Sequence, residues 1–131
     1  MTKEEIAIGN RIIGEYMGLP DVKIDQGETI ARVPSPKGWE EQFPRGGIII
    51  LSYHSNWNQL MSVVDKLEES GQILVFFEMK GDDGNKERLV KFMSRPWYGF
   101  GSEKFTDTKI EATFQAVVEL IKSINENKDD L

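Results

Sequence analysis

Three amphipathic stretches, one near each end of the chain and one in its middle, most constrain the fold. Apolar residues recur at helical spacing over residues 2–17, 56–69 and 109–125. This spacing is typical of helices that bury one face. In the middle stretch Trp57 falls in register with the apolar stripe, so we expect it in the core, since an indole at such a position packs more often than it binds.

The helix ends carry recognisable signals. Thr2 and Glu5 have the spacing of a capping box, in which each side chain satisfies the other residue's free backbone N–H. Ser55 is the expected N-cap of the middle helix. Gly18 and Gly71 follow the last periodic residues of the first two stretches, and glycine there favours helix termination.

Strand-like runs separate these helices, and they occupy residues 22–24, 29–33, 48–53, 72–80 and 86–94. The run at 48–53 is apolar on both faces at its start, which predicts a buried strand. Residues 81–85 are turn formers, so the last two runs predict a hairpin. The expected fold is α+β, with three helices packed on a small, mostly antiparallel sheet of four or five strands. Parallel pairing across residues 48–80 stays open, because strand–helix–strand crossovers favour it.

Length and composition indicate one cytoplasmic domain. The chain has 131 residues, of which 39% are hydrophobic, and this length fits a single domain, 1–131. It has no cysteine, which excludes disulfides and thiolate metal sites and favours a reducing compartment. Its first residues are polar with no long apolar run behind them, so we expect neither a signal peptide nor a membrane span.

Charge argues against a general polyanion partner. The formal net charge is −6, whereas nucleic-acid binding needs a positive surface to displace counterions. Residues 80–106 are the exception, with six basic and four acidic side chains, a net of +2. A solvated hairpin explains this balance as well as a ligand does, so a weak nucleic-acid contact through residues 80–104 is kept as an alternative.

His54, the only histidine, is the one candidate catalytic residue. It follows a predicted strand and precedes a predicted helix, where it could act as a general base if a carboxylate such as Asp65, Glu68 or Asp107 oriented its other nitrogen. The alternative is a helix-entry residue bonded to the nearby backbone. No catalytic motif accompanies His54, so we lean against an enzyme.

Two aromatic loops are the candidate binding segments. The first, residues 34–47, is rich in proline and glycine and contains Trp39. The second, residues 95–107, brings Arg95, Trp97 and Tyr98 together. Arginine and large aromatic residues dominate binding hot spots. The alternative is that Trp97 and Phe100 plug the open end of the sheet, and the Trp39 loop could likewise be a core plug.

No metal or cofactor is expected. One histidine without cysteine makes a structural zinc site improbable. The acidic turn at residues 82–85 lacks the spaced oxygen ligands and closing glutamate of a calcium loop. The sequence also contains no phosphate-binding glycine loop.

Three segments resemble small proteins encoded in bacterial and bacteriophage genomes: NRIIGEYMG at residues 10–18, YHSNWNQLMSVVDKLE at residues 53–68 and AVVELIK at residues 116–122. The resemblance covers roughly the three helices. That family has no established activity, so the resemblance implies no mechanism. This chain has Asn58, Gln59 and Ser62 where the family pattern has Asp, Trp and Pro.

The sequence therefore predicts a small non-enzymatic binding or accessory protein, and a phage or mobile-element origin is one interpretation of the resemblance. Its partner would be another protein rather than nucleic acid or membrane. A small enzyme using His54 as general base is the first alternative, and the nucleic-acid contact through residues 80–104 is the second.

Overall fold

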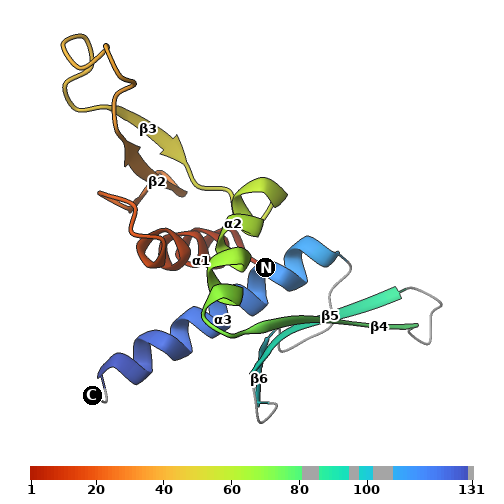
Figure 1. Ribbon diagram of the computed structural model, residues 1–131. Coiled ribbons are helices and arrows are strands. Elements are labelled where there is room, and N and C mark those ends of the chain that lie inside the picture. The colour runs from red at the N-terminus through yellow and green to blue at the C-terminus, as the bar shows by residue number, and fades with distance from the viewer. Residues whose placement is uncertain (81–85, 95–97, 102–107, 130–131) are drawn as a thin grey trace. The chain divides into compact units, whose positions relative to one another are not determined.

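The computed structural model describes residues 1–80, 86–94, 98–101 and 108–129 (Figure 1). Over these residues the chain forms three helices and two antiparallel sheets. The helices are α1 (Lys3–Tyr16), α2 (Trp57–Glu69) and α3 (Lys109–Asp129). The first sheet has the order β1-β2-β3, and its strands are Lys23–Asp25, Glu28–Val33 and Gly47–Ile50. The second has the order β4-β5-β6, and its strands are Ile73–Lys80, Lys86–Ser94 and Tyr98–Gly101.

Contacts group the chain into two units, residues 1–52 and residues 53–131. The α+β class is confirmed, but the single sheet of four or five strands is wrong. The run after residue 46 pairs with β2 as a local antiparallel hairpin, which needs no crossover connection. The parallel pairing across α2 therefore does not form. The single-domain expectation stays a prediction.

In the first unit, α1 packs on β1 and β2. Two alternate residues of β2, Thr29 and Ala31, are buried. The Thr29 hydroxyl donates a buried hydrogen bond of 2.6 Å to the Ala7 carbonyl of α1. A Cβ on Gly14 would lie 2.6 Å from Leu51 Cδ1, so the missing side chain is what lets α1 approach that leucine closely.

Local signals set the ends of α1 and the first hairpin. The Thr2 side chain accepts from the Glu5 backbone N–H at 3.1 Å, as the capping box predicts. Gly18, at φ 76°, follows the last turn and donates to the Glu15 carbonyl, a glycine C-terminal motif. Gln26 and Gly27 both have positive φ between β1 and β2, which is the geometry of a two-residue type I′ turn.

The second unit buries one face of α2 against α3, and both helices contact the β4-β5-β6 sheet. Among the side chains that the structure describes in this unit, the largest fully buried ones belong to α2 and α3, and they are Leu60, Val63, Val64, Leu67, Phe114, Val117, Leu120 and Ile121. The predicted hairpin of residues 72–80 and 86–94 is confirmed, with register from Ile73↔Met93 to Lys80↔Lys86.

Three local predictions in the second unit are wrong. Asn56, not Ser55, caps α2, and its side chain accepts from the Gln59 N–H at 3.2 Å. Trp57 lies in the first turn of α2 and is 40% exposed instead of buried, because the buried stripe runs through Leu60 and its neighbours one turn on. Residues 98–101 form β6 rather than loop, since pairing with β5 outweighs the low strand propensity of their two glycines.

Candidate functional site

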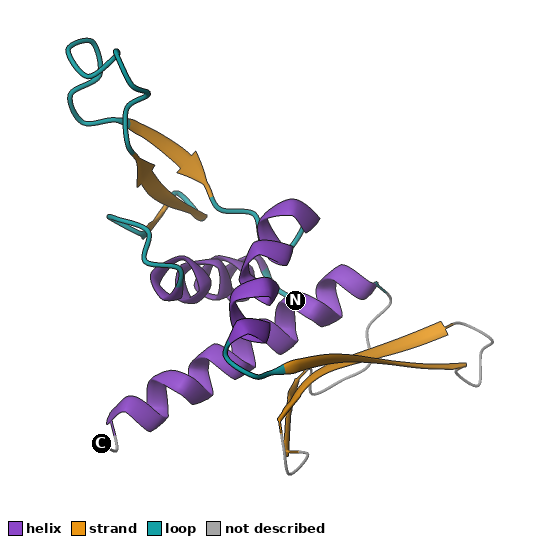
Figure 2. Ribbon diagram, in the orientation of Figure 1, coloured by secondary structure: helices purple, strands orange, loops and turns teal. Residues whose placement is uncertain are grey.

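The long connection between β2 and β3, teal near the top of Figure 2, forms an ordered loop over residues 34–46. Its backbone turns on itself through N–H groups of Trp39, Phe43 and Gly46, which donate at 3.0 Å to the carbonyls of Pro36, Trp39 and Phe43. The Ser35 hydroxyl also donates to the Phe43 carbonyl. These bonds hold the path of the loop through contacts within the chain itself.

The loop is tied to the strand that precedes it. One terminal nitrogen of Arg32 donates to the Arg45 carbonyl at 3.1 Å. Gly46 has φ 71°, and a Cβ there would lie 2.0 Å from the Val33 carbonyl oxygen. Only glycine fits this close approach, so Gly46 closes the base of the loop.

Trp39 and Phe43 stand on this loop as an exposed aromatic pair. Their ring centroids are 6.2 Å apart with an interplanar angle of 29°, within the range of an offset stack. Trp39 is 54% exposed and Phe43 is 52% exposed. The loop therefore presents a rigid aromatic surface to solvent, and the alternative that Trp39 plugs the core is wrong.

The strand after the loop adds two more exposed apolar side chains. Ile48 is 64% exposed and Ile50 is also exposed, so the predicted burial of both faces at the start of the run 48–53 is wrong. The strand itself forms over Gly47–Ile50, and Leu51 and Tyr53 after it are buried. A run of isoleucines is compatible with a buried strand and with an edge strand. Here β3 is an edge strand, because among the described strands it pairs with β2 only. We call Trp39, Phe43, Ile48 and Ile50 the hairpin surface.

Strand register places charged residues on the same sheet face as these isoleucines. Ile30 of β2 lies opposite Ile50 of β3 and opposite Lys23 of β1, and Arg32 lies opposite Ile48. Directly opposed residues share a face of an antiparallel sheet. The face away from buried Ala31 thus carries isoleucines and two cations together.

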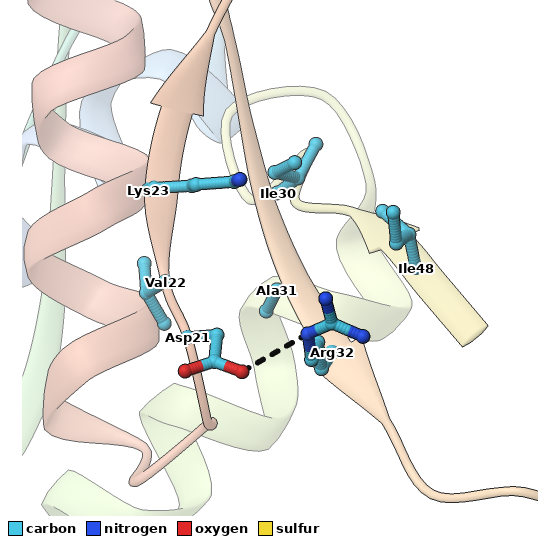
Figure 3. A pocket seen from close by; sticks show the side chains of 7 residues that line it. All are labelled: Asp21, Val22, Lys23, Ile30, Ala31, Arg32 and Ile48. Atoms are coloured by element: carbon cyan, nitrogen blue, oxygen red, sulfur yellow. Dashed lines mark ion pairs between the residues drawn. The ribbon is translucent and has the colours of Figure 1, made fainter. Parts of the chain in front are cut away.

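A pocket of about 390 Å³ opens on this face (Figure 3). Its polar lining is Asp21, Lys23 and Arg32, and its apolar lining is Val22, Ile30, Ala31 and Ile48. Asp21 Oδ2 lies 3.0 Å from Arg32 Nε. Asp21 itself has φ 54°, a left-handed conformation that aspartate tolerates better than most residues.

The two cations of the pocket differ in what holds them. Arg32 is positioned by Asp21 on one side and by the Arg45 carbonyl on the other. Its second terminal nitrogen has no partner in the part of the chain that the structure describes. Lys23 makes no ion pair with any described residue. The pocket therefore combines an oriented guanidinium with an ammonium group still able to pair with an anion.

His54 lies in the turn before α2 and packs against the core. Its ring centroid is 6.0 Å from that of Phe114, at an edge-on angle of 69°. Burial lowers the pKa of His54 below the usual histidine value. Of the predicted carboxylate partners, Asp65 and Glu68 are exposed residues of α2, and Asp107 lies outside the described residues. The aromatic contact indicates packing as the role of this ring.

The second predicted binding segment is described only in part. Arg95 and Trp97 lie outside the described residues. Tyr98 begins β6, opposite Ser94 of β5. The basic segment of residues 80–104 likewise falls where side chains are not described, so its role stays a prediction.

Two further observations concern metals and membranes. Among the described residues, no three or more His, Asp or Glu side chains gather where they could hold a metal ion. None of the helices in the described ranges combines the length and the apolar character needed to cross a bilayer.

The sequence singled out Trp39 as a binding candidate, and that role stays a prediction. It did not indicate that Ile48 and Ile50 are exposed, or that Lys23 and Arg32 share a sheet face. One usable signal was the alternation of small Thr29 and Ala31 with larger residues in β2. Small side chains at every second position favour a close helix on that face, which leaves the larger residues pointing outward.

Comparison of the chain with protein-family models, with curated proteins and with solved structures gives no match.

Proposed function

We propose that this protein is a non-enzymatic binding module that recognises another protein through the hairpin surface. The observation that carries the proposal is the stacked pair of Trp39 and Phe43, each more than half exposed on a hydrogen-bonded loop. Large aromatic side chains supply most of the energy in protein interfaces, and leaving two of them in water has no benefit for folding.

The hydrogen-bonded conformation of the loop supports the proposed binding role. Binding by a mobile loop loses free energy through the ordering of its backbone. Here the backbone bonds to Pro36 and Phe43, and the closed base at Gly46, supply that order before any partner arrives. A preformed aromatic surface is thus suited to a rigid docking contact.

A protein partner fits better than nucleic acid. The whole chain carries a net charge of −6, and an acidic protein is repelled by phosphate backbones. Exposed isoleucines and exposed aromatic residues on one hairpin are instead the composition of an interface centre. The edge position of β3 also offers backbone groups to an extended segment, the mode called β-augmentation.

The test uses the full chain to select binders from a library of random peptides displayed on phage. We expect selected peptides to lose affinity at least roughly 30-fold for the double variant Trp39→Ala, Phe43→Ala. Ile8→Ala removes an exposed apolar side chain of α1 and serves as the matched control. Selected peptides that bind the double variant and wild type equally would contradict the proposal.

A further inference from the structure

The pocket beside the hairpin surface has the composition of a site for an anion with an apolar neighbour. Ligand sites are mostly apolar, with a few polar groups that fix orientation. Here Ile30 and Ile48 supply apolar area, while Lys23 and Arg32 supply positive charge on the same sheet face (Figure 3).

Charge complementarity identifies the ligand chemistry. The Asp21 carboxylate balances the positive charge of Arg32. The charge of Lys23 is not balanced in this way, because Lys23 has no ion-pair partner among the described residues. One more negative charge would balance the two cations. A singly charged carboxylate fits this requirement, whereas a phosphate group would bring a second charge close to the Asp21 carboxylate.

We infer that the pocket binds the carboxylate of an acidic side chain in an extended segment of the protein partner, with the adjacent apolar residue of that segment on Ile30 and Ile48. This inference rests on the proposed function. The segment is favoured over a free metabolite because the site lies on the face of a three-stranded sheet, which lacks the walls that enclose small ligands.

Arg32 and Lys23 have separate parts in this recognition. The Asp21 and Arg45 contacts hold the guanidinium in place, so its free terminal nitrogen is already oriented toward an incoming oxygen. Lys23 adds a charge-assisted hydrogen bond from the neighbouring strand. Because Lys23 makes no described ion pair, replacing it leaves those contacts of the hairpin intact.

The experiment determines the sequences of the peptides that the full chain selects from the displayed library. We expect wild type to enrich Asp or Glu beside an apolar residue, and Lys23→Glu to enrich Lys or Arg at that position instead. Lys37→Glu makes the same change in net charge in the loop between β2 and β3, outside the pocket lining, and should leave the acidic preference unchanged. For a wild-type-selected peptide, Lys23→Glu should weaken binding at least roughly tenfold. The peptide's own Asp→Asn or Glu→Gln change should have a similar effect.

The outcomes separate this inference from the proposed function. Peptides that need Trp39 and Phe43 but show no acidic position, or that respond equally to Lys23→Glu and Lys37→Glu, would overturn the inference alone. Peptides that bind without Trp39 and Phe43 would overturn the proposed function and the inference together. Titration with phenylacetate tests a free carboxylate, and binding as tight as that of the peptides would exclude the peptide segment.

Discussion

Gly46 decides at the residue scale whether the aromatic loop keeps its shape. Its φ is positive, and a Cβ added at this position would lie 2.0 Å from the Val33 carbonyl oxygen. Gly38 also has positive φ, but a Cβ there would meet nothing within 4 Å. The two glycines therefore separate the cost of backbone conformation from the cost of a steric clash.

We expect Gly46→Ala to lower the free energy of unfolding by more than about 2 kcal/mol, since strain and clash add. Gly38→Ala should cost only about 1 kcal/mol, from the conformation alone. Urea unfolding followed by circular dichroism measures both. Equal costs for the two variants would show that the loop base adjusts and that the glycine at 46 is not required for closure.

His54 should make stability depend on pH in one direction. Its folded-state pKa lies below the ordinary value of about 6.5 because burial disfavours the imidazolium. As pH falls through that value, the unfolded chain binds a proton before the folded chain does, so stability decreases toward acid. Above the ordinary pKa the residue contributes no such loss.

The single histidine makes this measurable without ambiguity. An NMR titration of its imidazole proton should give a pKa below that of a histidine in a short peptide. The difference in unfolding free energy between about pH 7.5 and 5.5 should shrink in His54→Gln. A titration midpoint above the peptide value would indicate a charged partner and would revive the general-base interpretation.

At the scale of elements, one buried hydrogen bond joins α1 to the sheet. The Thr29 hydroxyl donates to Ala7 at 2.6 Å, away from solvent. We expect Thr29→Val, which keeps the shape and removes the donor, to cost about 1–3 kcal/mol, because the Ala7 carbonyl then loses a buried partner. Thr29→Ser keeps the hydroxyl and should cost less. The reverse order in denaturant unfolding would mean that the γ-methyl group matters more than the bond.

Helix boundaries were predictable because their signals are local. Thr2 and Gly18 each form a hydrogen bond with a backbone group three residues away. The signal and the group that it caps therefore lie within one helical turn of the sequence. The N-cap of α2 was missed by one position because Ser55 and Asn56 are both good caps. Composition does not distinguish two adjacent capping residues.

Strand partners and exposed faces were less predictable, since they depend on distant residues. The isoleucines of β3 are compatible with burial on both faces, and only their pairing with β2 and the place of α1 put Ile48 outside. The same reason hid the candidate site. Lys23 and Arg32 are nine positions apart and share a face only through the β1–β2 register.

At the scale of the whole molecule, the two units have unequal cores. Among described residues, the buried apolar side chains of the first unit are Ala7, Ile13, Ala31 and Leu51, whereas the second unit buries many more and larger ones. Buried apolar area is the main source of stability. The first unit should therefore open at a lower free energy than the second.

Hydrogen exchange tests this difference in the intact chain. The Leu51 amide donates to the Thr29 carbonyl at 2.9 Å, and the Val117 amide lies in the buried stripe of α3. We expect Leu51 to exchange faster, with a lower opening free energy. Equal protection of the two amides would show that the chain opens only as a whole, as a single cooperative domain should.

The α+β class was predictable because it needs only the order of helical and strand-like patterns. The division into two three-stranded sheets was not, because it depends on whether β3 pairs across the loop or across α2. Loop closure favours the shorter connection only slightly. The outcome thus depends on tertiary packing around Leu51 and Val22, which short-range patterns do not report.

The edge strand β3 has a consequence for the solubility of this protein at high concentration. It presents Ile48 and Ile50 to solvent, and it carries no lysine or proline of the kind that protects sheet edges from self-association. Uncharged β-branched strands are templates for cross-β assembly when left uncovered. Production of the chain with β3 uncovered should therefore yield more insoluble protein as its concentration rises, and Ile48→Lys should reduce that insoluble fraction.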